Sequence, residues 1–201
     1  LGLVGVGLSL PRAPGRARGL PSLRELLPGD RRIRWLSISR FFLFGSRDLW
    51  FVVALPVFLT DGLAWTAPEV GGALALWVIG YGGLQALAPR WVGGARTGDG
   101  QETRAPGGAR LTGWTVALLV PCLATGVALH LDAPPVMTLV LGLGIFAVAF
   151  ASGSAIHSYL IVAYADTDKV AMNVGFYYMA NALGRLVGTV LSGVLYALGG
   201  Q

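Results

Sequence analysis

The 201-residue chain is 54% hydrophobic and only 12% charged. Because about a quarter of the residues in a soluble domain are charged, this composition excludes an ordinary soluble globular protein. The net charge of +5 does not indicate nucleic-acid binding, since the basic residues lie in short segments beside apolar runs. The single cysteine, Cys122, excludes an intrachain disulfide, and His130 and His157 lack ligand spacing. We therefore expect no metal and no cofactor.

The chain opens within an apolar stretch, residues 1–10, that is too short to cross a bilayer. We expect this stretch to be the end of a transmembrane helix. Residues 11–40 are rich in arginine and predict a basic cytoplasmic linker. Near its end, Asp30 is a plausible N-cap for a helix that continues into the next apolar run.

Five apolar runs follow, each long enough to cross a bilayer, which needs about 20 residues per helix. We predict spans at 41–60, 70–89, 111–131, 136–163 and 171–198. Pro56 and Pro121 are expected to kink their spans. The connections 61–69 and 132–135 contain no Lys or Arg, whereas 90–110 and 164–170 do. Because Lys and Arg concentrate in cytoplasmic loops, we predict that segments 11–40, 90–110 and 164–170 are cytoplasmic.

Arg185 lies near the middle of the last predicted span, where a charged residue is costly and usually faces the bundle interior or a water-filled path. Polar residues recur with it at steps of three or four, which places them on one helical stripe. Either Arg185 contacts a substrate or it pairs with a carboxylate elsewhere in the bundle. Gly184 and Gly188 beside it form a small-residue pair that favours close helix packing. The stripe consists of Tyr178, Asn181, Arg185, Thr189, Ser192 and Tyr196.

Arg47 and Asp48 lie about two turns into the first predicted span. Neighbouring helical residues point about 100° apart, so we expect them to face different partners. Arg47 either lines a cavity or extends to the cytoplasmic interface. Asp48 is expected to neutralise Arg185 or Arg47, or to take up a proton. His157, in the fourth predicted span, is either a neutral hydrogen-bonded residue or a group for anion binding or proton transfer.

The sequence contains no nucleophile, metalloprotease or nucleotide-binding motif. Catalysis therefore has no positive support, and we expect a protein that is not an enzyme. A membrane-embedded enzyme and a non-transporting scaffold are alternatives, although the scaffold would not need the Arg185 stripe.

Residues 25–36, ELLPGDRRIRWL, resemble the central cytoplasmic loop and the seventh helix of major facilitator transporters. Three further stretches are similar to the ArsJ-type organoarsenical efflux permeases: 44–53, FGSRDLWFVV; 76–86, LWVIGYGGLQA; and 173–193, NVGFYYMANALGRLVGTVLSG. The third is the longest and most discriminating.

This resemblance implies an all-α integral membrane protein. The chain would be the C-terminal part of a twelve-helix major facilitator fold, with the end of helix 6 at 1–10 and five complete spans within 41–201. It also implies export of 1-arseno-3-phosphoglycerate from the cytoplasm across a bacterial inner membrane, which confers arsenate resistance. The resemblance further implies a functional link between this transporter and a glyceraldehyde-phosphate dehydrogenase, the enzyme that makes the exported compound from arsenate.

The implied cargo is a polyanion, and arginine suits phosphate-type oxyanions because its planar fork donates two hydrogen bonds at once. We expect Arg185 and Arg47 to contact the oxyanion, with Asn181, Tyr178 and His157 as orienting donors and Asp48 as the coupling or charge-pairing group. The expected partners are the lipid bilayer, the small anion and a coupling proton. An alternative is a major facilitator exporter of another small molecule, such as a sugar phosphate or a drug.

Overall fold

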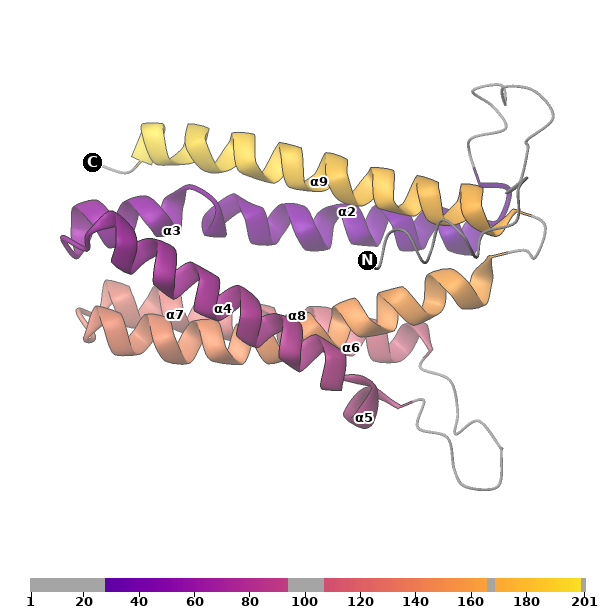
Figure 1. Cartoon of the computed structure of the whole chain (residues 1–201), viewed down its shortest axis with the longest axis horizontal. Helices are drawn as coiled ribbons and strands as arrows, with labels where there is room; N and C mark the ends of the chain where they lie inside the picture. Colours follow the sequence, from indigo (N-terminus) through magenta and orange to yellow (C-terminus); the bar gives the residue numbers. More distant parts are fainter. Residues whose placement is uncertain (1–27, 94–106, 166–168, 200–201) are drawn as a thin grey trace, which may run out of the picture.

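The computed structural model describes residues 28–93, 107–165 and 169–199, and within these ranges every regular element is a helix (Figure 1). The elements are α2 (Arg31–Phe51), α3 (Ala54–Val57), the π-helical turn η1 (Phe58–Gly62), α4 (Ala67–Leu87), α5 (Pro89–Val92), α6 (Gly108–Ala117), α7 (Leu119–His130), α8 (Pro135–Tyr164) and α9 (Val170–Gly199).

Five helical units in the described part of the chain are long and apolar enough to cross a membrane. They are Arg31–Gly62, Ala67–Leu87, Gly108–His130, Pro135–Tyr164 and Val170–Gly199. These units confirm the prediction of an all-α chain with five membrane-type helices. The predictions for residues 1–10 and 11–27 fall outside the described residues.

Residues 31–40, which we assigned to the linker, are helical in α2 and run directly into the first predicted span, as expected for a helix capped by Asp30. The predicted cap is confirmed: the backbone N–H of Arg32 donates to Asp30 at 2.7 Å. This first part of α2 is amphipathic, with Ile33 and Leu36 buried and Arg34 exposed. An apolar stripe at helical spacing can extend a helix well beyond an uninterrupted hydrophobic run.

Both prolines interrupt their helices, as predicted. A proline removes the hydrogen bond to the carbonyl four residues before it and its ring collides with that carbonyl. For Pro56 that position is Val52, where α2 ends. For Pro121 it is Ala117, the last residue of α6.

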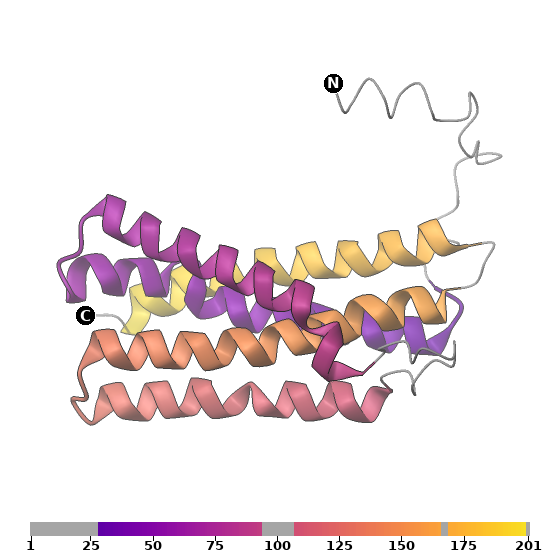
Figure 2. The ribbon, with the colours of Figure 1, turned by 60° about the horizontal axis from the view of Figure 1, so that its bottom comes forward.

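The helices alternate in direction, so that α2, α6–α7 and α9 run one way and α4 and α8 run the other (Figures 1 and 2). This arrangement places the acidic turn residues Asp61 and Asp132, with Glu69 in the first turn of α4, at one end of the bundle. The opposite end carries basic residues: Arg31, Arg32, Arg34, Arg90, Arg110 and Lys169. The alternation in the sequence thus becomes a separation of charge along the bundle.

Helix α9 packs chiefly against α2, and glycines allow the two backbones to approach closely. A Cβ on Gly184 would overlap the carbonyl of Phe41, and one on Gly188 would overlap the carbonyl of Gly45. Small residues at such positions are typical of close helix packing in membranes. Gly184 and Gly188 therefore fix the separation of the two helices that carry the charged residues described below.

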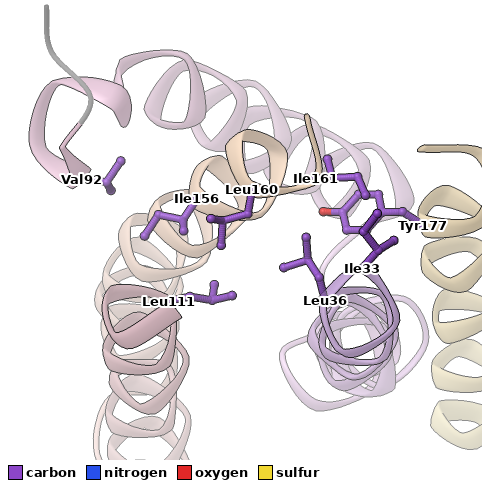
Figure 3. Packing of buried hydrophobic residues seen from close by; sticks show 8 residues of the cluster. All are labelled: Ile33, Leu36, Val92, Leu111, Ile156, Leu160, Ile161 and Tyr177. Atoms are coloured by element: carbon purple, nitrogen blue, oxygen red, sulfur yellow. The ribbon is translucent and has the colours of Figure 1, made fainter. Parts of the chain in front are cut away.

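An apolar cluster fills the basic end of the bundle (Figure 3). Tyr177 reaches from α9 to lie between Ile33 of α2 and Ile161 of α8. Further along the bundle, a second cluster is built around Phe44, Phe146 and Phe150. The buried arginines of α2 lie beside these two clusters.

Candidate functional site

Helix α2 carries three charged residues away from its ends: Arg40, Arg47 and Asp48. Positions seven or eight apart are two helical turns apart and share a face. Arg40 therefore lies on the same side of α2 as Arg47 and Asp48, two turns closer to the start of the helix. At a rise of about 1.5 Å per residue, Asp48 is about 12 Å further along the helix than Arg40. Two polar regions therefore follow one another along α2.

The first region, which we name the Asp48 network, consists of Arg47, Asp48 and Arg185. The Asp48 side chain is 1% exposed and accepts from both arginines. Arg47 approaches its Oδ1 at 2.5 Å through Nη2 and 2.7 Å through Nε. Arg185 donates from Nε to Oδ2 at 2.9 Å. One buried carboxylate thus joins α2 to α9.

Arg47 differs from the expectation that it and Asp48 face different partners. The two Cα–Cβ bonds diverge, but the long arginine side chain curls back along the helix to reach the adjacent carboxylate. Its guanidinium carbon also lies 4.8 Å from the centre of the Phe44 ring and 5.3 Å from that of Phe150. The side chain is only 11% exposed, so it neither extends to the interface nor lines an open cavity.

Arg185 is held differently. Its side chain is 53% exposed, and its Nε–Asp48 bond is its only contact of this kind within the described ranges. Of the two arginines in the Asp48 network, only Arg185 is placed to reach a further anion.

The second region, which we name the Arg40 cluster, joins α2, α8 and α9. Its members come in pairs one helical turn apart: Ser37 and Arg40, Ser154 and His157, Tyr177 and Asn181. Arg40 donates from Nη1 to Ser154 Oγ at 3.0 Å. Its guanidinium carbon lies 4.0 Å from the centre of the Phe44 ring and 5.3 Å from that of Tyr177.

Arg40 has no carboxylate partner among the described residues, although it is 95% buried (5% exposed). Aromatic faces stabilise a cation by about 0.5–2 kcal/mol, which offsets only part of the cost of desolvating an arginine. Phe44 lies between the two regions and contacts both Arg40 and Arg47. The interior of α2 therefore carries an uncompensated positive charge.

His157 is fully buried, so its ring belongs to the interior of the bundle. Its Nε2 lies 3.4 Å from Ser39 Oγ, and its Nδ1 has no hydrogen-bond partner in the described part of the chain. The His157 and Tyr177 rings are 6.2 Å apart between centroids. The structure thus brings His157 to Arg40 rather than to Arg185.

The predicted α9 stripe divides in the structure. Asn181 and Ser192 lie on the side that faces α2, and Ser192 Oγ accepts from the backbone N–H of Ala54, just past the break in the first span. Tyr178 is 53% exposed and points away from the interior. Its neighbour Tyr177 is the buried tyrosine, because a rotation of about 100° per residue brings position 177 onto the face defined by Gly184 and Gly188.

The larger apolar pocket, of about 360 Å³, lies away from both polar regions. It is lined by side chains of several elements, such as Phe58 of η1, Leu129 of α7 and Leu143 of α8. It lacks charged lining residues, so it offers nothing to orient an anion. Within the described residues, no group of three His, Cys, Asp or Glu side chains is placed to hold a metal ion.

Comparisons with protein-family models, with curated proteins and with solved structures give no match to this chain. The functional interpretation therefore rests on the residues and their geometry, together with the sequence resemblance stated above.

Two central residues, Arg40 and Tyr177, were missed by the sequence reasoning. Arg40 falls at the last position before the apolar run, so it was grouped with the linker arginines. A signal was present: Ile33, Leu36, Arg40, Leu43 and Phe44 follow helical spacing, which places Arg40 on the buried side of α2. Tyr177 was missed because the stripe was drawn through Arg185, whose flexible side chain lies at the edge of the packed face.

Proposed function

We propose that this chain is part of a major facilitator transporter that exports an organoarsenical polyanion, 1-arseno-3-phosphoglycerate, from the cytoplasm by alternating access. The segments 11–40, 90–110 and 164–170 are cytoplasmic in this proposal, and the membrane is a bacterial inner membrane. The protein acts as a secondary transporter rather than as an enzyme.

The charge balance inside the spans carries this proposal. Arg40, Arg47 and Arg185 lie away from the helix ends, and Asp48 is the one carboxylate that faces any of them in the described ranges. Charged residues at membrane depth are costly and usually mark substrate or ion paths. An excess of two arginines supports an anionic cargo over a cationic or neutral one.

The geometry also supports a coupling role for Asp48. The bond between Asp48 and Arg185 links α2 to α9, so protonation of the carboxylate or competition by an oxyanion would release Arg185. Arg47 would remain on α2, paired with Asp48 and packed against Phe44 and Phe150. In a transporter that rocks one half against the other, Arg185 is therefore the oxyanion contact and Arg47 the positioning residue.

Support for the arsenical itself comes from the resemblance of residues 44–53, 76–86 and 173–193 to ArsJ-type permeases. The longest of these stretches contains Tyr177, Asn181 and Arg185, which are the α9 members of the two polar regions. The stretches that carry the resemblance thus include the Asp48 network and the α9 members of the Arg40 cluster.

The test is arsenic export by the full-length transporter in arsenate-sensitive bacteria that co-express glyceraldehyde-phosphate dehydrogenase. We expect cellular arsenic to fall only when both proteins are present. Arg185→Gln should abolish export while leaving the amount of protein in the membrane unchanged. Arg185→Lys should impair export, because a point charge lacks the two-pronged geometry of the guanidinium.

The matched control is Arg90→Gln, which removes the same charge from an exposed position at the basic end of the bundle. It should export normally. Normal export by Arg185→Gln would contradict the role of Arg185 in transport. Dehydrogenase-independent export of a sugar phosphate or an apolar drug would favour the alternative of another facilitator substrate.

A further inference from the structure

Five buried side-chain atoms in the described part of the chain have no hydrogen-bond partner. They are Ser37 Oγ, Arg40 Nε, His157 Nδ1, Tyr177 OH and Asn181 Oδ1. Each belongs to the Arg40 cluster. Buried polar groups without partners are rare in proteins and costly. Their gathering in one region of three helices indicates a common cause rather than five separate packing defects.

The cluster is well defined geometrically. Arg40 is tied to α8 through Ser154 and contacts α9 through the Tyr177 ring. His157 is held near Ser39 of α2, at 3.4 Å from its hydroxyl. Tyr177 extends from α9 towards α8, and its hydroxyl end lies between the two helices (Figure 3). Arg40, His157 and Tyr177 are each at least nine-tenths buried.

The chemistry of the unpaired groups is that of an oxyanion site. The unpaired arginine N–H, tyrosine O–H and serine O–H are donors, and the imidazole Nδ1 is a donor in one tautomer. The unpaired Oδ1 of Asn181 is an acceptor. A phosphate-type group presents negative oxygens that accept hydrogen bonds. Its protonated form, or a hydroxyl next to it in the solute, also supplies an O–H donor. A guanidinium without a carboxylate partner is the matching positive charge.

We propose that the Arg40 cluster is a binding site for a tetrahedral oxyanion group, phosphate or arsenate, of a small solute. Arg40 neutralises the group, Tyr177 and His157 donate or accept at its oxygens, and Ser37 and Asn181 complete the set. The site lies about 12 Å along α2 from the Asp48 network, towards the basic end. Its role as the cytoplasmic-side station of a transport path rests on the function proposed above, whereas binding itself does not.

The experiment measures equilibrium binding of radiolabelled 3-phosphoglycerate to the purified full-length transporter, with inorganic arsenate and acetate as competitors. We expect arsenate to compete and acetate to compete weakly. Arg40→Gln should weaken binding about hundredfold and Tyr177→Phe about tenfold, since hydrogen bonds to charged groups are the strong ones. Arg40→Lys should restore only part of the affinity.

Two variants serve as matched controls. Arg34→Gln removes the same charge from an exposed position of the same helix, and Tyr159→Phe removes a tyrosine hydroxyl from a more exposed position on α8. Both should bind like the wild type. If Arg40→Gln does not fold, Tyr177→Phe decides, because it removes one oxygen atom and keeps the ring in place.

Unchanged affinity in both Arg40→Gln and Tyr177→Phe would overturn the site. Absence of any 3-phosphoglycerate or arsenate binding to the wild type would also overturn it. The proposed function fails separately: variant-sensitive binding without arsenic export keeps the site and removes the exporter. Arsenic export that is unchanged in the Arg40 and Tyr177 variants would keep the exporter and remove the Arg40 cluster from its transport path.

Discussion

The two polar regions along α2 each hold an arginine against the Phe44 ring, but only one of them contains a carboxylate. In the Asp48 network, Asp48 accepts from Arg47 and Arg185 and is almost completely buried. In the Arg40 cluster, a buried arginine donates to Ser154 and contacts two aromatic rings, with no carboxylate partner among the described residues. A buried arginine that is neutralised within the protein holds helices together. One that is not neutralised is available to an anion.

The two arginines of the Asp48 network differ in how far their side chains are buried. Arg47 is buried against Phe44 and Phe150, whereas more than half of the Arg185 side chain is exposed. Arg47 also approaches Asp48 through two nitrogens, whereas Arg185 donates to it from one. We therefore expect Asp48 and Arg47 to act mainly on stability and Arg185 to act mainly on transport.

The largest expected effect comes from Asp48→Asn, which leaves two arginines without their carboxylate. Removal of one partner from a buried ion pair typically costs about 3–5 kcal/mol. We expect a large fall in the thermal unfolding temperature of the purified full-length protein. Asp132→Asn, at an exposed turn with positive φ that asparagine tolerates, is the control and should change little. Equal stability of the two variants would remove the structural role of Asp48.

The second prediction compares Arg47→Gln with Arg185→Gln. Arg47→Gln should lower the free energy of unfolding by about 1.5–3 kcal/mol, as expected for a buried charge-assisted hydrogen bond. Arg185→Gln should lower it less, by about 1 kcal/mol, because Arg185 makes a single hydrogen bond to Asp48, whereas Arg47 approaches it through two nitrogens. Denaturation of both purified variants checks the order. The reverse order would show that burial does not govern the two pairs.

The third prediction concerns the spacing of α2 and α9. Gly188→Ala places a methyl group against the carbonyl of Gly45, and overpacking of this kind costs about 1–3 kcal/mol. We expect lower thermal stability together with reduced arsenic export, since both polar regions depend on the α2–α9 contact. Gly193→Ala, on the same helix with open space around it, is the matched control. A loss of stability in Gly193→Ala of the same size would point to helix backbone effects instead.

The smallest expected effect is at the start of α2, far from either polar region. Asp30→Ala removes the N-cap and should cost about 1 kcal/mol. Asp30→Asn should keep most of that contribution, because asparagine also caps helices well. Thermal unfolding of the two variants at neutral pH separates the cap from the charge.

The pH dependence of this cap follows from the same contacts. The Arg32 side chain and backbone N–H donate to Asp30 and hold the pKa of its carboxyl below its usual 3.8. A lowered folded-state pKa gives stability that is present above the unfolded-state pKa and lost as the pH falls through the folded-state value. The difference in unfolding temperature between wild type and Asp30→Asn should therefore shrink only below about pH 4. A difference that persists at lower pH would contradict this.

Much of the fold was predictable from local patterns. Five apolar runs, the Asp30 cap and the breaks at Pro56 and Pro121 each depend on residues close in the sequence. The helix that leads into the first span begins at Arg31, directly after the predicted cap, although residues 31–40 were assigned to the linker. For the candidate site, the sequence indicated Asp48 as a partner of Arg185 or Arg47, and the structure shows that Asp48 pairs with both. The sequence did not indicate that His157 lies with Arg40 rather than with Arg185.

The sequence by itself determined the helical membrane-type architecture and the separation of basic from acidic connections, because hydrophobic length and loop charge are local properties. Only the tertiary structure decided which charges meet. Arg185 joins Asp48 across 137 positions, and Arg40 joins Ser154 across 114. Such pairings depend on the depth and rotation of each helix, which are set by close contacts such as that between Gly45 and Gly188. A periodic pattern along one helix does not contain that information.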